Sequence, residues 1–178
     1  MDDIVRQALR KWPDVPDCYG WLGLDMRGQW WLRDDAAQAA GPFPQSKGEL
    51  LSHDKLLGFI GRNYEPDAQG RWFFQNGPQR VYVELEAAPW VWRLEPAGQL
   101  CTHTGMPAQA SQAWLDEVGY LYLSTETGML GVVHTQDMVH AAAALEAHAW
   151  PLHECSQAQL AQQFGFVHSP LQLRTSSA

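Results

Sequence analysis

Cys101 and His103 have the residue types of a nucleophile beside a base, because a thiol that gives its proton to an imidazole becomes a strong nucleophile. On one strand the two side chains would share a face about 6.5–7 Å apart, too far for direct contact unless the strand bends. Glu84 and Glu86 would likewise share a face and could act as an acid and a base. These residues predict, as one hypothesis, a small hydrolase or transferase with a Cys101/His103/Glu84 site. Glutamates on a solvated strand explain the same pattern.

His148, His153 and Cys155 are types that bind metal ions, and they lie close together in the sequence. A structural zinc site normally has four such ligands. Here there are only three candidate ligands, one before Pro151 and two after it. They therefore give only an alternative hypothesis, a metal-binding protein. Histidines at a helix end explain the same residues.

Motifs that would identify an enzyme are absent from the sequence. There is no Gly-x-Ser-x-Gly, the turn that presents the serine nucleophile of many hydrolases. Neither Gly-x-x-x-x-Gly-Lys-Ser/Thr nor Gly-x-Gly-x-x-Gly, which cradle nucleotide phosphates, occurs. We therefore assign no catalytic residue and no cofactor, and we expect a protein that binds rather than one that catalyses.

Alternation along the predicted strands separates two faces. Residues 80–86 show the pattern most clearly, with Val81, Val83 and Leu85 inward and Tyr82, Glu84 and Glu86 outward. The face predicted to form the core carries Trp30, Leu32, Trp72, Phe74, Leu100, Leu121 and Leu123. The opposite face mixes aromatic and polar side chains, which suits an interaction surface. Its candidate ligand-binding residues are Trp31, Arg33, Phe73, Tyr82, Glu84, Arg93 and Tyr122. A helix or a second chain that covers this face is the alternative interpretation.

A repeated turn pattern must position these side chains. An acidic residue, two variable residues and a glycine precede alternating large residues at 25–28, 67–70 and 116–119, and more loosely at 95–98. Aspartate first and glycine fourth are typical of type I turns that lead into a returning strand. The pattern predicts an α+β protein with an antiparallel β-sheet built from Asp-x-x-Gly hairpins and with helices packed on one face.

The remaining patterns predict helices at 2–12, 52–63 and 136–148, and a further helix with a capping box at 156–159. Residues 35–49 have the composition of a loop, and 170–178 of a frayed tail. We expect a single domain over 1–178, within which 18–75 and 80–134 could be an internal structural repeat.

Charge and composition disfavour some classes of binding partner. The formal net charge of -8 with only 12 Lys and Arg disfavours nucleic acid, because polyanion binding needs clustered basic residues. No apolar run approaches membrane-spanning length, so we expect no membrane partner. A homodimer, a small molecule or a peptide remains open as partner. Three scattered cysteines and an acidic N-terminal segment favour the cytoplasm.

The runs 11–25 (Lys-Trp-Pro-Asp-Val-Pro-Asp-Cys-Tyr-Gly-Trp-Leu-Gly-Leu-Asp) and 70–83 (Gly-Arg-Trp-Phe-Phe-Gln-Asn-Gly-Pro-Gln-Arg-Val-Tyr-Val) carry a family resemblance. They resemble a proteobacterial family that is labelled as a domain of unknown function, and the resemblance extends over most of the chain. It implies a bacterial, cytoplasmic, single-domain protein, and it implies no activity and no site residues.

Overall fold

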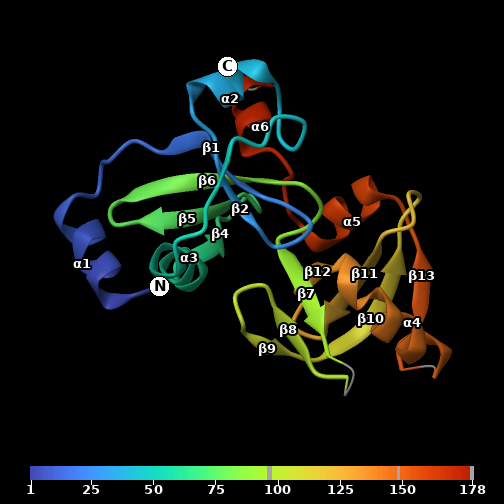
Figure 1. Ribbon diagram of the computed structural model, residues 1–178. Helices are drawn as coiled ribbons and strands as arrows, with labels where there is room; N and C mark the ends of the chain where they lie inside the picture. The colour runs from blue at the N-terminus through green and yellow to red at the C-terminus, as the bar shows by residue number, and fades with distance from the viewer. Residues whose placement is uncertain (96–97, 148, 177–178) are drawn as a thin grey trace. The chain divides into compact units, whose positions relative to one another are not determined.

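A computed structural model describes residues 1–95, 98–147 and 149–176. The chain forms two compact units. The first comprises Met1–Asp25, Gln29–Glu86 and Phe166–Ala178, and the second comprises Met26–Gly28 and Ala87–Gly165. Each unit has its own β-sheet (Figure 1).

The first sheet has the strand order β3-β2-β1-β6-β5-β4. Its strands are β1 (Cys18–Leu24), β2 (Trp30–Leu32), β3 (Glu49–Leu50), β4 (Tyr64–Pro66), β5 (Trp72–Asn76) and β6 (Gln79–Leu85). All neighbours are antiparallel except β1 and β6, which run parallel. A bulge in β1 between Cys18 and Leu22 shifts its register against β6.

Helices cover both faces of the first sheet. This unit contains α1 (Asp3–Lys11), α2 (Asp35–Ala40), α3 (Asp54–Arg62) and α6 (Pro170–Ser176). Figure 1 shows α2 and α6 on one side of the sheet and α3 on the other. Phe59 of α3 packs edge-on against Phe74, so α3 covers the apolar face. The core between α3 and the apolar face of the first sheet includes Leu22, Leu24, Trp30, Ile60, Phe74, Val83 and Leu85.

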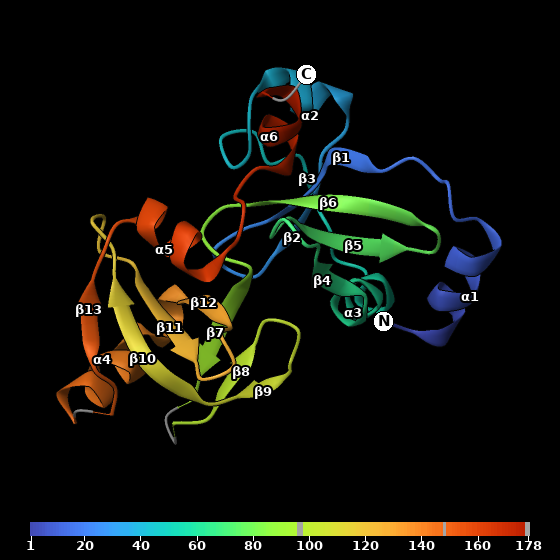
Figure 2. The ribbon, with the colours of Figure 1, turned by 180° about the vertical axis from the view of Figure 1, so that it is seen from behind.

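The second sheet has the order β13-β10-β11-β12-β7-β8-β9 (Figure 2). Its strands are β7 (Trp90–Leu94), β8 (Leu100–Thr102), β9 (Pro107–Ala108), β10 (Ala110–Leu115), β11 (Leu121–Thr125), β12 (Leu130–Val133) and β13 (Leu152–Glu154). The helical segments of this unit are η1 (Thr135–Asp137), α4 (Met138–Glu146) and α5 (Gln157–Phe164).

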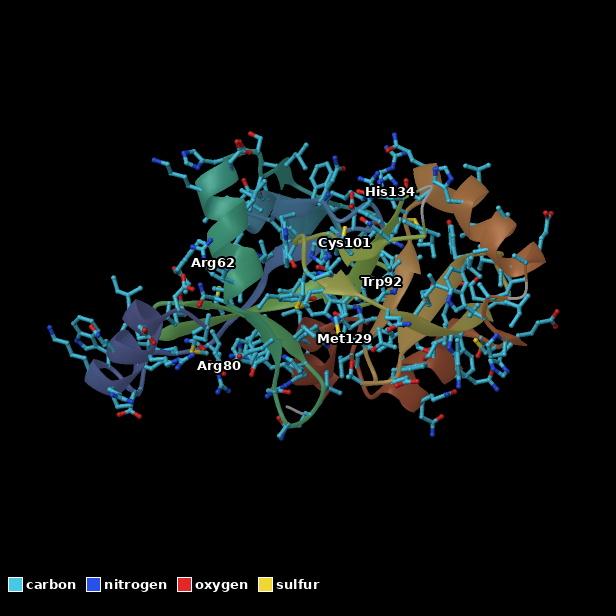
Figure 3. All side chains as sticks on the ribbon, turned by 90° about the horizontal axis from the view of Figure 1, so that it is seen from below. Arg62, Arg80, Trp92, Cys101, Met129 and His134 are labelled. Carbon is cyan, nitrogen blue, oxygen red and sulfur yellow. The ribbon has the colours of Figure 1, made fainter. Side chains whose placement is uncertain are left out.

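Trp92 is the largest fully buried side chain of the second unit, and it lies among its strands in Figure 3. Its indole Nε1 donates a hydrogen bond to the carbonyl of Leu123. Gly131 lies beneath the ring, and a Cβ there would stand 2.6 Å from the indole nitrogen. The absence of a side chain at Gly131 therefore makes room for the tryptophan.

The repeated turns have the predicted conformation. The fourth-position glycine has a φ of 75° at Gly28, 75° at Gly70 and 99° at Gly119, which is the left-handed region that favours glycine. The predicted α+β class with mostly antiparallel strands is confirmed, with two sheets in place of one. The prediction of one domain over 1–178, with a repeat at 18–75 and 80–134, stays a prediction. The segment 80–134 begins within β6, which belongs to the first sheet, and its other strands belong to the second sheet.

Two local predictions are wrong. The predicted loop 35–49 contains α2, because Asp34 caps this helix by accepting a hydrogen bond from the amide of Ala37. The predicted frayed tail 170–178 contains α6 over Pro170–Ser176, and the last two residues lie outside the described chain. A Ser-Pro start explains α6, since Ser169 accepts a hydrogen bond from the amide of Gln172 and proline is favoured at the first helical position.

One predicted core residue is also misplaced. Leu32 is 42% exposed, because it ends β2 beside the two-residue edge strand β3, opposite Glu49. The other predicted core residues are buried or half-buried. In the described chain, no helix combines the length and the apolar character needed to cross a bilayer.

Candidate functional site

The turn aspartates hold polar groups of aromatic side chains. Asp25 accepts a hydrogen bond from the backbone amide of Gln29 through one oxygen and from the indole of Trp31 through the other. Asp67 and Asp116 repeat this arrangement. They bind turn amides through one oxygen and the hydroxyls of Tyr82 and Tyr122, respectively, through the other. Each turn thereby fixes one of the predicted ligand-binding residues.

Five of the seven predicted ligand-binding residues lie on one face of the first sheet. Gly23 pairs with both Trp31 and Glu84, while Tyr82 pairs with Phe73, so strand alternation brings these side chains to one side. We call the face that carries Trp31, Arg33, Phe73, Tyr82 and Glu84 the polar-aromatic face. The strand alternation read from the sequence therefore placed these five residues on one side, as the strand pairing does.

The other two predicted residues belong to the second sheet. Arg93 of β7 forms a bidentate ion pair with Asp137, with nitrogen–oxygen distances of 2.7 and 3.2 Å. Tyr122 of β11 is buried, and its hydroxyl binds Asp116. The prediction that all seven residues share one sheet face is wrong, because the Asp-x-x-Gly hairpins are divided between two sheets.

The predicted outward orientation also needs correction. Arg33, Phe73, Tyr82 and Glu84 are all less than 5% exposed. α2 and α6 and the segment between α2 and β3 lie over the polar-aromatic face (Figure 1). Helical cover, the alternative considered above, is therefore what the structure has at these residues.

One end of the polar-aromatic face is a charged cluster around Lys47. Its ammonium lies 3.2 Å from the carboxylate of Asp25 and 3.1 Å from that of Glu86. It also lies 5.4 Å from the ring centroid of Trp31. Burial lowers the pKa of Lys47, but the hydrogen bonds and charges of Glu86 and Asp25 outweigh it and raise the pKa overall. The single ammonium of Lys47 is thus shared between two carboxylates of the fold.

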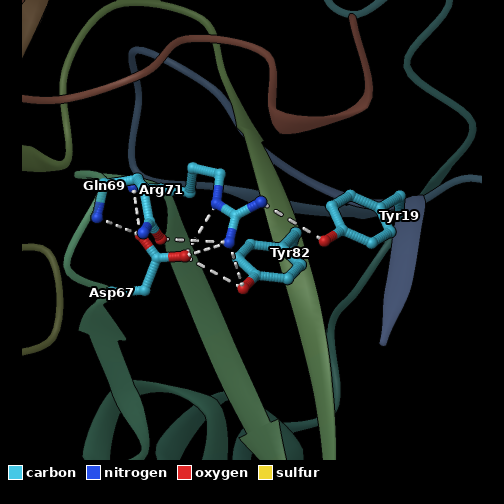
Figure 4. A network of polar contacts seen from close by, with 5 residues as sticks. All are labelled: Tyr19, Asp67, Gln69, Arg71 and Tyr82. Atoms are coloured by element: carbon cyan, nitrogen blue, oxygen red, sulfur yellow. Dashed lines mark hydrogen bonds and ion pairs between the residues drawn. The ribbon is translucent and has the colours of Figure 1, made fainter. Parts of the chain in front are cut away.

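The other end is the network shown in Figure 4. Asp67 binds the guanidinium of Arg71 and the hydroxyl of Tyr82, and Arg71 also donates to that hydroxyl at 3.1 Å. Tyr19 stacks on Tyr82 with ring centroids 4.5 Å apart. Burial and the hydrogen bond to Asp67 raise the pKa of Tyr82 to about 12. The phenol thus remains protonated and structural at neutral pH.

Between these ends lies a pocket of about 190 Å³. Its lining comes from α2, β6 and α6 and from residues that follow β2, follow α2 or precede α6: Arg33, Gln38, Gly41, Pro42, Phe43, Glu84, Ser169, Leu171 and Gln172. Two predicted ligand-binding residues, Arg33 and Glu84, are thus brought together. The ring of Phe43 lies over Gly23, where a Cβ would stand 2.6 Å from it. A glycine on the intervening strand therefore makes room for the aromatic wall of the pocket.

Arg33 is held by backbone carbonyls. Its guanidinium donates to the carbonyl oxygens of Ser46, Gly20 and Gly41 at 3.0, 3.1 and 2.6 Å. Burial lowers the pKa of Arg33, and the charge of Glu84 counteracts this effect. An arginine stays protonated even so, because its unperturbed pKa is above about 12. Arg33 therefore brings a fixed positive charge to the pocket.

Glu84 brings the negative charge. Its carboxylate accepts hydrogen bonds from the hydroxyl of Ser169 and from the amide of Leu171, at the start of α6. Burial raises the pKa of Glu84, and these hydrogen bonds and the charge of Arg33 only partly offset the rise. Within the described residues, Glu84 and Arg33 form neither a hydrogen bond nor an ion pair with each other. Two opposite charges thus line one small pocket while remaining apart.

The residues of the hydrolase or transferase hypothesis are divided between the units. Glu84 is engaged by α6 in the first unit. In the second, Cys101 lies opposite Arg93, and the Nδ1 of His103 accepts a hydrogen bond from the amide of Val91. This hypothesis stays a prediction.

The metal-binding hypothesis rests partly on His148, which lies outside the described residues. His153 of β13 packs on Trp114 with centroids 4.6 Å apart. Burial and the charges of Asp116 and Glu117 raise the pKa of Cys155, which favours the neutral thiol over the thiolate that binds metals. In the part of the chain that the structure describes, no three His, Cys, Asp or Glu side chains form a metal-binding group.

The sequence prediction missed several residues of the pocket. Phe43 and Gln38 come from the segment predicted as a loop, and nothing in its Ala-, Gly- and Pro-rich composition indicates a pocket wall. Ser169 and Leu171 come from the predicted tail. There the pattern Ser169-Pro170-x-Gln172 is a helix-start signal that could have identified α6.

The fold and the pocket define an α+β protein with two mostly antiparallel sheets, whose first unit holds a small pocket lined by an arginine and a glutamate. The chain belongs to the family described as "Protein of unknown function (DUF2946)", whose model matches residues 1–171. This confirms the expected membership in a family of unknown function. The comparison with curated proteins found no match.

Two solved structures of DUF1285 family proteins are similar to this chain. The one from Silicibacter pomeroyi DSS-3 has a TM-score of 0.49 at 12% identity, and the match covers 79% of this chain and 83% of that one. The one from Shewanella baltica OS155 has a TM-score of 0.45 at 17% identity, with coverage of 69% and 91%.

Proposed function

We propose that this protein is a non-enzymatic binding module that takes a small polar ligand into the Arg33–Glu84 pocket. The observation that carries the proposal is the pair of buried, opposite charges that line one pocket without pairing with each other. Buried charges are costly unless they are compensated. Hydrogen bonds of the fold and the charge of the other residue compensate Arg33 and Glu84 in part, and a ligand that reaches both groups would add an ion pair to each.

The surroundings of the pocket support binding rather than catalysis. Arg33 and Glu84 are fixed by backbone groups of different segments, so both are preorganised. The one hydroxyl among the lining residues, that of Ser169, donates to Glu84 and accepts from the amide of Gln172, so both of its hydrogen-bonding roles serve to hold the start of α6. A rigid site of this kind favours recognition.

We also infer that the protein acts in the cytoplasm. The support is the acidic composition, with pI near 5.2, and the free state of Cys18, Cys101 and Cys155. Free thiols suit a reducing compartment.

The proposal is tested by NMR titration of the ¹⁵N-labelled protein with a library of small polar fragments. The reporter is the amide of Leu171, which donates to Glu84. We expect a subset of fragments to shift this amide saturably in the wild-type protein. Glu84→Gln should abolish or strongly weaken the shift, whereas Glu146→Gln, which removes an exposed carboxylate at the end of α4, should leave it unchanged. If no fragment perturbs the pocket residues, the proposal is wrong.

A further inference from the structure

We infer that the ligand of the Arg33–Glu84 pocket is a small zwitterion of the α-amino acid type, an inference that rests on the proposed function. A molecule of this class carries a carboxylate for Arg33 and an ammonium for Glu84, and it has no net charge. The pocket has the same balance, with one guanidinium and one carboxylate among its lining residues. Ligand and pocket therefore match in the sign and in the number of their charges.

Both charged groups keep hydrogen-bonding capacity. A guanidinium has five N–H donors. Arg33 donates to three carbonyl oxygens, those of Gly20, Gly41 and Ser46, so donors remain for a carboxylate. Each oxygen of Glu84 accepts one hydrogen bond from the start of α6, and a carboxylate oxygen can accept two. An ammonium group could use the remaining positions.

Strand geometry separates the two charges. Arg33 follows β2 and Glu84 lies on β6, with β1 between these strands. Neighbouring strands are about 4.8 Å apart, so one intervening strand puts the two backbones roughly 10 Å apart. Both side chains line the pocket, which therefore takes one charge from each side of β1.

The volume limits the size of the ligand. A pocket of about 190 Å³ is small. Alanine, with its few non-hydrogen atoms, suits this volume better than tryptophan, whose side chain is much larger. The apolar wall formed by Pro42, Phe43 and Leu171 suits the Cα and a short side chain.

Ligands with a single charge fit less well. A monoanion would engage Arg33 and leave Glu84 facing an uncompensated negative group. A monocation would engage Glu84 and leave Arg33 facing an uncompensated positive group. Each would leave the filled pocket with a net charge, which is costly in a buried site, whereas a zwitterion leaves it neutral.

The test is calorimetric titration of the full-length protein with four probes, together with the Leu171 amide shift. Alanine is the zwitterion, N-acetylalanine the anion, alaninamide the cation, and tryptophan the oversized zwitterion. We expect alanine to bind at least about tenfold more tightly than either singly charged analogue, the loss typical of one charge-assisted hydrogen bond. Tryptophan should bind more weakly than alanine. Glu84→Gln should weaken alanine far more than N-acetylalanine.

The outcomes separate this inference from the proposed function. If N-acetylalanine or alaninamide binds as tightly as alanine and shifts Leu171, the pocket binds ligands and the zwitterion inference is wrong. If no probe and no fragment of the library shifts Leu171, the proposed function itself fails. The comparison among probes uses the wild-type protein, so it decides the question even if Glu84→Gln does not fold.

Discussion

Glu84 is the residue on which the proposed site depends most. It lies in the middle of a sheet, is 4% exposed, and holds the start of α6 through its two oxygens. A carboxylate in such a place is costly to stability when it is charged. A residue that is unfavourable for folding and lines a pocket is a typical functional residue.

The pH dependence of stability should reveal this cost. Burial raises the pKa of Glu84 above its unfolded value of about 4.3. The protonated form therefore favours the folded state: its contribution is complete below about pH 4.3 and is lost as the pH rises through the folded-state pKa. Glutamine mimics the neutral acid. We expect the free energy of unfolding of Glu84→Gln to rise relative to that of the wild type between pH 4 and neutrality.

Urea unfolding at a series of pH values measures this difference. The exposed Glu146→Gln serves as a control and should show little change with pH. A difference that falls as the pH rises would mean that the pKa of Glu84 is lowered, in contradiction to the described environment.

Gly131 gives a second prediction at this scale. An alanine Cβ would lie 2.6 Å from the indole nitrogen of Trp92 and 2.9 Å from the carbonyl oxygen of Trp90. Since Trp92 is fully buried, neither neighbour can move freely. Gly131→Ala should destabilise the protein by about 1–3 kcal/mol, the usual cost of overpacking. Thermal and urea unfolding measure it.

Gly58 of α3 is the matched control for that substitution. A Cβ there meets only the mobile end of Arg62, at 3.3 Å, and the position is exposed. Gly58→Ala should stabilise the protein by up to about 1 kcal/mol through helix propensity. Equal effects of the two substitutions would contradict the packing described for Trp92.

The sequence predicts the sheet face of a side chain where the alternation along a single strand decides it. Alternation alone placed Trp31, Tyr82 and Glu84 on one face of a sheet. It could not show that Arg33 and Glu84 meet at a pocket, because Phe43 and Leu171 reach it from distant segments. Long-range packing of this kind leaves no periodic signal in the sequence.

At the scale of elements, the Asp-x-x-Gly turns do more than reverse the chain. Each aspartate ties its turn to the polar group of an aromatic residue on the sheet: Trp31, Tyr82 or Tyr122. The turn pattern predicts the hairpins, but not the assignment of hairpins to two sheets. Strand pairing between segments far apart in sequence decides that assignment, as with the parallel pair β1 and β6.

α6 provides the prediction at this scale. Ser169 caps the helix at the amide of Gln172 and also donates to Glu84. Ser169→Ala should therefore remove a cap, at a typical cost of about 1 kcal/mol, and also leave a buried carboxylate with one partner fewer. We expect faster hydrogen exchange in α6 and a lower free energy of unfolding.

Ser156→Ala is the matched variant, because Ser156 caps α5 without touching a buried charge. It should lose only the cap contribution, so the loss for Ser169→Ala should be the larger of the two. If Ser156→Ala costs as much or more, the anchoring of α6 by Glu84 does not contribute to stability.

At the scale of the whole molecule, the chain builds its two units in different ways. The first unit needs both ends of the sequence, since the strands of the first sheet precede residues 87–165 in the chain and α6 follows them. The second unit is almost continuous from Ala87 to Gly165 and contains all the strands of its own sheet. Composition alone does not indicate this division, because no linker of distinctive residues marks it.

A fragment of residues 87–165 should therefore fold by itself. Its buried residues include Trp90, Trp92 and Leu123, and α5 keeps its capping box. We expect a cooperative urea transition and dispersed amide signals in its NMR spectrum. A fragment that is unfolded under native conditions would contradict an autonomous second unit and would support the single domain over 1–178.

The most direct test of the account is a crystal structure of the full-length protein grown with alanine. The account predicts electron density for the amino acid in the pocket, with its carboxylate at the guanidinium of Arg33 and its ammonium at the carboxylate of Glu84. A structure in which Arg33 and Glu84 form a direct ion pair and leave no space between them would contradict it.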